Sequence, residues 1–276
     1  MTGERLTTPP HWSELLKTAL ELPGQAGSTY NRFRRFSLGN QALLMMQGLM
    51  EPVNTYKGWL ALDRQVKRGS KAKAIYVPMF RKEKNDDGDE ERRLSGFKLV
   101  PSIFGVSETE GEELPPYEPP HWSKERAMAK LSIIQVPYES LEGNSQGYSI
   151  ARQFAINPVA VYPFKTTLHE MAHICCGHTT SEEMEEYRSH RGLKEFEAEG
   201  SAYLLMNELG ATEQFDAAES RDYIQSWLSG EQPPESSVKK VFSTADKIYR
   251  AGLEEPEGDE PDAERNLDTS GQLQAA

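Results

Sequence analysis

The stretch that decides the fold of the second half of this chain is Thr166 to His178, "TTLHEMAHICCGH". On a helix, residues four positions apart lie on one face, so His169 and His173 can offer two imidazoles to one metal ion. Such an ion lowers the pKa of a bound water from about 15.7 to near 7, and a neighbouring glutamate can remove its proton. The pentapeptide predicts a metal site on a helix that follows strand-like "FAINP", with Glu170 as the catalytic residue. The same five letters also occur by chance in unrelated proteins. The motif therefore indicates a metal site only if the chain also supplies a third ligand.

Residues 194–205, "KEFEAEGSAYLL", supply candidate third ligands. Glu195 and Glu199 are four apart on one face of an otherwise apolar helix, where an unpartnered carboxylate would be costly. We expect Glu195 to bind the metal and Glu199 to accept the ring N–H of a ligand histidine, a support that such ligands commonly have. The alternative is that Glu199 is the ligand. Glu197 projects from roughly the opposite face, and we expect it to be solvated.

The remaining soft or nitrogen ligands are weaker candidates. We expect His178, after Gly177 at a helix end, and His190, in a polar loop, to be surface residues. Cys175 and Cys176 are adjacent, which rarely suits a disulfide, and small packing residues are the simpler interpretation. Since a catalytic zinc keeps three protein ligands, the sequence predicts one Zn²⁺ per chain, with another divalent metal as the alternative.

Composition indicates a protein of the cytoplasm with an uneven charge. The 276 residues carry a net charge of −12, and 37% of them are hydrophobic. There is no apolar run near the roughly 18 residues that a membrane span needs, and "MTGERLTTPPHW" lacks the pattern of a secretion signal. Residues 1–130 hold 20 basic and 17 acidic side chains, against 11 and 26 in the remainder. A basic module therefore precedes an acidic one.

Residues 30–84 concentrate the positive charge, with 12 basic and 3 acidic side chains. Proteins that bind single strands combine cations for phosphates with aromatic rings for bases. The alternative is that Phe33, Phe36 and Trp59 belong to a core and the cations only keep the surface soluble. The candidate contacts to nucleic acid are Tyr30, Arg32, Arg34, Arg35, Lys57, Trp59, Arg64, Lys67, Arg68, Lys71 and Lys73.

Hydrophobic periodicity predicts an α+β chain. Helical spacing is present at 11–22 and 39–50, and residues 72–80 and 97–106 are typical of strands. We expect the charged run 81–96 to be a solvated hairpin tip and the Pro-rich segment 108–122 to be a connector. A strand pair is expected within 147–158, with "ARQFAINP" as an edge strand, and helices at 164–178, 196–210 and 221–230. The last two dozen residues have no hydrophobic pattern and are expected to be disordered.

Several of these motifs, in this order, resemble the ArdC family of antirestriction proteins. "YNRFRRFSLGNQALLMMQ", "TYKGWLALDRQVKRGSKAKAIYVPMF" and "GFKLVPSIFGVSETEGEELP" look like its N-terminal domain, which binds single-stranded DNA. "GYSIARQFAINP", "KTTLHEMAHICCGH" and "EFEAEGSAYLL" are similar to its zincin-like metallopeptidase domain. The resemblance covers roughly residues 12–230. Within it, Glu108 stands where the family has a neutral amide, which argues against DNA contact there.

The resemblance implies a small α+β DNA-binding domain at 1–115, a zincin-like, gluzincin-type domain at 116–252 and an acidic tail at 253–276. It implies a protein of a mobile element or phage that protects incoming DNA, with His169, His173 and Glu195 on the metal and Glu170 as the catalytic residue. If active, the second domain would hydrolyse a peptide bond. Two alternatives are a DNA-binding protein with a structural metal and a regulatory protease that cleaves a repressor.

Overall fold

The computed structural model describes residues 6, 8–21, 29–32, 36–84, 90–139, 145–230 and 233–254, and for residues 84, 90–92, 181–191 and 229 it describes the backbone alone. The described chain contains both helices and strands, in separate runs along the sequence, which is consistent with the α+β prediction. In chain order they are α1 (Trp12–Leu20), α3 (Leu38–Met46), β1 (Val53–Thr55), α4 (Tyr56–Leu60), β2 (Arg64–Val66), β3 (Lys73–Lys84), β4 (Glu90–Gly105), η1 (Val106–Glu108), β5 (Thr109–Gly111), α5 (Lys124–Leu131), β6 (Ile134–Gln135), β7 (Gly147–Ile150), β8 (Gln153–Ile156), α6 (Pro163–Cys176), α7 (Ser181–Glu208), η2 (Thr212–Gln214), α8 (Ala217–Ser229) and α9 (Glu235–Gly252).

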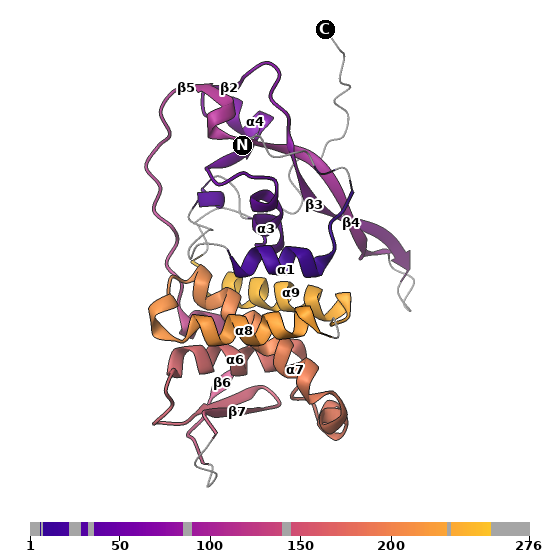
Figure 1. Ribbon diagram of the computed structural model, residues 1–276, viewed down its shortest axis with the longest axis vertical. Helices are drawn as coiled ribbons and strands as arrows, with labels where there is room; N and C mark the ends of the chain where they lie inside the picture. Colours follow the sequence, from indigo (N-terminus) through magenta and orange to yellow (C-terminus); the bar gives the residue numbers. More distant parts are fainter. Residues whose placement is uncertain are drawn as a thin grey trace.

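The described strands form three small sheets at the two ends of the molecule, with a stack of helices between them (Figure 1). The first sheet is antiparallel, in the order β1-β4-β3, and β2 pairs with β5 beside it. At the other end β8 lies between β6, which is parallel to it, and β7, which is antiparallel. The expectation that "ARQFAINP" is an edge strand is therefore wrong, because β8 is the central strand of this sheet and β7 is an edge.

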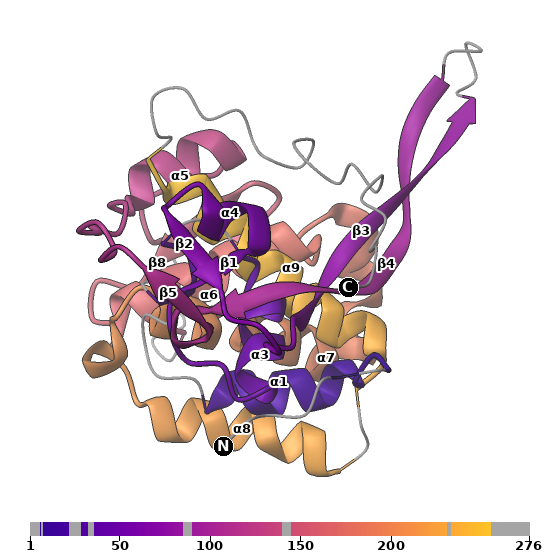
Figure 2. The ribbon, with the colours of Figure 1, turned by 90° about the horizontal axis from the view of Figure 1, so that it is seen from above.

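The hairpin of β3 and β4 extends well beyond the body of the molecule (Figure 2). Its pairing runs from Lys73 with Ile103 to Lys84 with Glu90. The charged run 81–96 thus lies at the solvent-exposed end of a hairpin, as expected, but most of it is paired strand and not a loop, since charged side chains can occupy both faces of a ribbon that projects into solvent. Residues 85–89 lie outside the described part, as do the acidic tail residues 255–276.

One hydrophobic core continues from the first helices into the last ones. It includes buried side chains from α1 (Leu15), α6 (Leu168), α7 (Leu204) and α9 (Phe242). Helix α9, which is not among the helices expected from the sequence, packs on α1, α5, α6 and α7. A smaller cluster lies under the first sheet, around Leu44 and Ile103. In the described part of the chain, no helix is both long enough and apolar enough to cross a membrane.

Local signals explain how the site helix α6 begins and ends. Pro163 is its first residue, where the missing N–H of proline costs no helical hydrogen bond. Gly177 follows its last residue with φ +84°, a left-handed conformation that favours glycine. The chain reverses there, and α7 returns along α6. Because α7 begins at Ser181, His190 lies within a helix and the prediction that it occupies a loop is wrong.

Candidate metal centre and nucleic-acid interface

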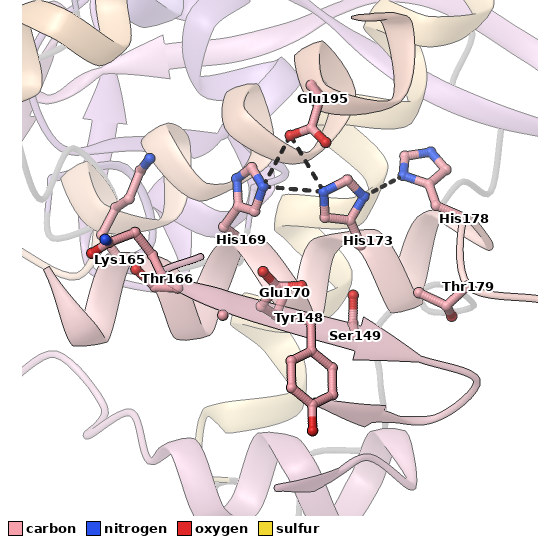
Figure 3. Close-up of a pocket in the computed structure, with 12 residues that line it drawn as sticks. Tyr148, Ser149, Lys165, Thr166, His169, Glu170, His173, His178, Thr179 and Glu195 are labelled. Atoms are coloured by element: carbon pink, nitrogen blue, oxygen red, sulfur yellow. Dashed lines mark hydrogen bonds and ion pairs between the residues drawn. The ribbon is translucent and has the colours of Figure 1, made fainter. Parts of the chain in front are cut away.

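Helices α6 and α7 bring two imidazoles and one carboxylate together (Figure 3). The Nε2 atoms of His169 and His173 are 3.1 Å apart. Oε2 of Glu195 lies 3.3 Å from Nε2 of His169 and 3.7 Å from Nε2 of His173. The two Nε2 atoms and the Oε2 atom can each direct a lone pair at the same point between the three side chains.

These donor atoms fit a small divalent metal. Tetrahedral zinc with bonds of about 2.0–2.1 Å to nitrogen and oxygen places its ligand atoms roughly 3.3–3.4 Å apart. The observed 3.1, 3.3 and 3.7 Å are distributed around that separation. Two nitrogens and one carboxylate oxygen also form the ligand set of several catalytic zinc sites. The residues present can thus hold the ion that the sequence implies.

The charges around the cluster favour a cation. Burial tends to raise the pKa of Glu195, but hydrogen bonds with His169 and His173 hold it well below its usual range. Burial tends to lower the pKa of His169, but hydrogen bonds to Glu195 and Glu199 and the nearby charges of Glu199 and Glu170 raise it to about 9. Positive charge is therefore stabilised where the metal would lie.

Glu199 lies behind His169, away from the three converging donors. Its Oε2 is 3.1 Å from Nδ1 of His169 and 2.6 Å from Nζ of Lys165. A carboxylate at Nδ1 accepts the N–H there and leaves the lone pair of Nε2 for a metal. The supporting role of Glu199 stays a prediction, and its Oε2 contacts the ring nitrogen of His169 that faces away from the cluster.

Two expectations about neighbouring residues are wrong. His178 is only 4% exposed and Glu197 only 2%, although both were expected at the surface. Nε2 of His178 is 2.8 Å from Oε2 of Glu197, and its Nδ1 is 2.9 Å from Nδ1 of His173. A signal was available in the sequence: Glu197 stands between Phe196 and Ala198 at the start of the largely apolar stretch 196–206 of α7, and such a stretch is buried.

A cleft of about 470 Å³ opens beside the cluster, between α6 and β7. Glu170, which is 7% exposed, lies on the side of α6 that faces this strand (Figure 3). The backbone of β7 approaches α6 closely, since a Cβ atom on Gly147 would lie 3.3 Å from Oε1 of Glu170 and 3.0 Å from Cγ2 of Thr166. Among the described strands β7 has a neighbour on one side only, so an extended peptide could pair with its other side directly beside Glu170.

The expected DNA-contacting residues are divided by the fold. Tyr30 and Trp59 are 0% exposed and belong to the interior, so neither ring can stack on a base, and Lys73 is also buried. These three predictions are wrong, because a pattern of aromatic and basic residues does not distinguish a core ring from a stacking ring. Lys57, Lys67, Arg68 and Lys71 are exposed, and Arg32 and Arg64 are half-buried. Arg34 and Arg35 lie outside the described residues.

Two of the remaining basic side chains make hydrogen bonds within the protein. Nε of Arg64 donates to Oγ1 of Thr109 at 2.9 Å, and Nζ of Lys67 donates to the carbonyl of Ser107 at 2.9 Å. Glu108, the residue that departs from the family motif, accepts the N–H of Gly105 at 3.0 Å and closes the turn before β5. Its carboxylate is thus used in a turn.

A groove of about 580 Å³ lies between the β3–β4 hairpin and α9. Aromatic rings form one side: Trp12 is stacked on Tyr76 with 5.5 Å between centroids, and Phe97, 48% exposed, meets Tyr76 edge-on. The opposite side is α9, which contributes Lys239 and Arg250, both exposed, with Lys240 and Asp246 between them. Rings and cations thus face one another across the groove.

Comparisons with known proteins support the resemblance seen in the sequence. Residues 11–103 match the family model of the N-terminal domain of the anti-restriction factor ArdC. The fold is shared with the metal-free crystal structure of the antirestriction protein ArdC from plasmid R388, at 17% identity over 87% of this chain and 94% of that chain, with a TM-score of 0.50. The Mn(II)-bound form of that protein matches at 15% identity over 87% and 95% of the two chains, with a TM-score of 0.45. No curated protein sequence is significantly similar to this chain.

Proposed function

Since this chain carries the N-terminal domain of the ArdC family and shares the ArdC fold, we propose that it is a DNA-binding antirestriction protein with a zinc-dependent peptidase site. One observation carries the peptidase half. The donors of His169, His173 and Glu195 converge beside a buried glutamate and β7, the edge strand of its sheet in the described part of the chain. A metal, a base and a strand for substrate pairing are the parts that metal-assisted peptide hydrolysis requires.

The residues of this chain divide the chemistry among them. A metal held by His169, His173 and Glu195 would supply Lewis acidity for the scissile carbonyl and for water. Glu170 takes a proton from the attacking water and returns it to the leaving amine, which is general acid–base catalysis by a carboxylate in reach of both. The edge of β7 fixes the peptide in an extended conformation, and Gly147 allows that strand to approach Glu170.

Glu170→Gln tests this half. The variant keeps the size of the side chain and does not alter the three donors, so it should bind one metal per chain like the wild-type protein. Cleavage of an unfolded probe protein such as casein, followed by mass spectrometry, should fall by at least about 100-fold. If wild type and variant are equally inactive while protection of DNA persists in both, the metal is structural and the peptidase proposal fails.

The groove between the hairpin and α9 is the proposed binding site for single-stranded DNA. A base can stack on the exposed face of Phe97, and phosphates can bind Lys239 and Arg250 on the opposite side, an arrangement typical of single-strand sites. Asp246 faces the same groove, but burial raises its pKa to about 6, so the carboxyl is more often protonated there than at the surface. A flexible single strand can enter this groove, whereas the stacked bases of a duplex cannot reach Phe97.

Fluorescence anisotropy on labelled single- and double-stranded oligonucleotides, at several salt concentrations, tests this site. Phe97→Ala should weaken single-strand binding by roughly 1–3 kcal/mol without changing its salt dependence. Lys239→Ala and Arg250→Ala should each reduce the slope of log affinity against log salt by about 0.7. Lys247→Ala is the matched control, because Lys247 is exposed on the same helix but does not line the groove. Equal effects of all three charge variants would place the strand elsewhere.

Entry of unmodified DNA into a restricting host, with and without this protein, tests the antirestriction role. The wild-type protein should raise the yield of transferred plasmid. Phe97→Ala should abolish the gain if single-strand binding is responsible, and Glu170→Gln shows whether proteolysis contributes. An unchanged yield with wild-type protein would refute the antirestriction assignment while leaving both binding tests valid.

A further inference from the structure

We propose that His178 and Glu197 position the ligand His173 by fixing which of its ring nitrogens carries the proton. The inference rests on the proposed metal site and adds two residues to it. Glu197 on α7, His178 after the end of α6 and His173 on α6 form one hydrogen-bonded chain. The links are 2.8 Å from Oε2 of Glu197 to Nε2 of His178 and 2.9 Å from Nδ1 of His178 to Nδ1 of His173.

The direction of each hydrogen bond follows from the carboxylate at the end of this chain. Nζ of Lys240 lies 3.0 Å from the same Oε2 of Glu197, and an ionised carboxylate can only accept. Nε2 of His178 must therefore carry a proton and donate it to Glu197. In a neutral imidazole the other nitrogen is then an acceptor, so Nδ1 of His178 accepts from Nδ1–H of His173.

The consequence at the cluster is a defined lone pair. With its proton on Nδ1, His173 has a free lone pair on Nε2, the atom that lies 3.1 Å from Nε2 of His169 and 3.7 Å from Oε2 of Glu195. The opposite tautomer would direct an N–H at the same point and exclude a metal. Burial strengthens the constraint, because at 4% and 2% exposure His178 and Glu197 have little access to water as an alternative partner.

The two ligand imidazoles thus differ in the group that accepts the N–H of Nδ1. His169 donates directly to the carboxylate of Glu199, whereas His173 reaches a carboxylate only through a second imidazole. A metal-ligating histidine commonly donates its other N–H to a carboxylate or a carbonyl. A neutral nitrogen acceptor is weaker than a carboxylate, so His178 needs the charge of Glu197 behind it to remain in the accepting tautomer.

A second metal bound by Cys176, His178 and Glu197 is the competing interpretation, because their ligand atoms also lie within 4.8 Å of one another. The contacts argue against it. Both nitrogens of His178 are engaged in hydrogen bonds, and Sγ of Cys176 is 3.2 Å from Oγ1 of Thr244. Burial also raises the pKa of the Cys176 thiol to about 12, which disfavours the thiolate that binds metals.

Zinc affinity, measured by competition with a chromogenic chelator, tests the proposal without any enzymatic readout. His178→Ala removes the acceptor and should weaken zinc binding roughly 10–100-fold. His178→Asn is the matched rescue, because an asparagine Oδ1 can occupy the place of Nδ1, and it should remain within about threefold of wild type. Cys176→Ala is the control for packing and should leave affinity unchanged; a loss of a second equivalent of zinc in that variant would favour the competing site.

Glu197→Gln tests the role of the charge. Its amide can place either Oε1 or N–H₂ against Nε2 of His178, and neither carries the negative charge that holds a proton on that nitrogen, so zinc affinity should fall while the fold is retained. Nitrogen NMR of ¹⁵N-histidine-labelled, metal-free protein should show His173 protonated at Nδ1 in the wild type and a smaller population of that tautomer in this variant. If His178→Ala fails to fold, His178→Asn and Glu197→Gln still decide the matter.

The outcomes separate this inference from the proposed function. Wild-type zinc affinity in His178→Ala and Glu197→Gln, both folded, overturns the positioning role even if the protein is an active peptidase. Conversely, loss of affinity in both variants with rescue by His178→Asn supports it even if no substrate is cleaved. A wild-type protein that binds no divalent metal refutes the metal site, and the tautomer of His173 then still reports whether the chain of hydrogen bonds exists.

Discussion

Replacing Gly147 by alanine should separate metal binding from substrate alignment. The new Cβ atom would lie 2.9 Å from the carbonyl oxygen of Ala155, 3.0 Å from Cγ2 of Thr166 and 3.3 Å from Oε1 of Glu170, whereas ordinary contacts begin near 3.4 Å. The contacts with Ala155 and Thr166 can be relieved only if β7 itself moves outward by about half an ångström. Overpacking of this kind costs roughly 1–3 kcal/mol, which lowers the melting temperature of a chain of this size by about 2–10 °C.

The donors of His169, His173 and Glu195 lie on α6 and α7, so one metal per chain should still bind with affinity within about threefold of wild type. Cleavage of the same probe protein should fall by roughly 10–100-fold, because a sub-ångström shift of the pairing edge misplaces the peptide relative to Glu170. Gly39→Ala is the control, since its Cβ would lie 3.4 Å from the ring of Trp12, at ordinary contact. Unchanged melting temperature and unchanged cleavage in Gly147→Ala would refute the reasoning, and loss of the metal would show that β7 supports the ligands.

Three further predictions concern single side chains. Burial raises the pKa of Asp246 to about 6, so the stability that its protonated form gives is present below pH 4 and lost as pH rises through 6. Asp246→Asn, which can still accept the N–H of Leu38 now bonded at 2.9 Å, should raise the free energy of unfolding in urea by roughly 1–3 kcal/mol at pH 8 and little at pH 4. Equal effects at both pH values would contradict this. Tyr30→Phe removes a buried hydrogen bond of 2.6 Å to the carbonyl of Leu49 and should lower unfolding free energy by about 1–2 kcal/mol; unchanged stability would contradict this. Glu199→Ala should weaken zinc binding roughly 10–100-fold yet leave one zinc per chain at saturation, and failure to bind stoichiometric zinc would make Glu199 a ligand.

The parts of the site that depend on local spacing could be predicted from the sequence. A helix places residues four apart on one face whatever surrounds it, so the pairing of His169 with His173 follows from the motif alone. The approach of Glu195 needed only one further step, a returning helix with a carboxylate on an apolar face. The ends of α6 are also local, because proline and glycine act within one turn.

The parts that failed depend on contacts between distant segments. Whether β7 or β8 forms the sheet edge is decided by β6, which pairs with β8 and leaves β7 open on one side. The burial of Glu197 depends on α9, which supplies Lys240, and on His178 at the far end of α6. Burial of Tyr30 and Trp59 depends likewise on how the first sheet covers them, since period and composition are the same for a ring that packs and a ring that stacks.

The two halves of the sequence differ in charge but share one hydrophobic core, and helix α9 joins them. Its buried face packs against α1 and α3 from the first half and against α5, α6 and α7 from the second. Its exposed face closes the groove with Lys239 and Arg250, and Lys240 also lies 3.0 Å from the Glu197 carboxylate that ends the hydrogen-bonded chain to His173. The boundary near residue 115 separates the two parts of the sequence that resemble different domains, while the proposed single-strand groove and the metal centre both depend on a helix that begins 120 residues later.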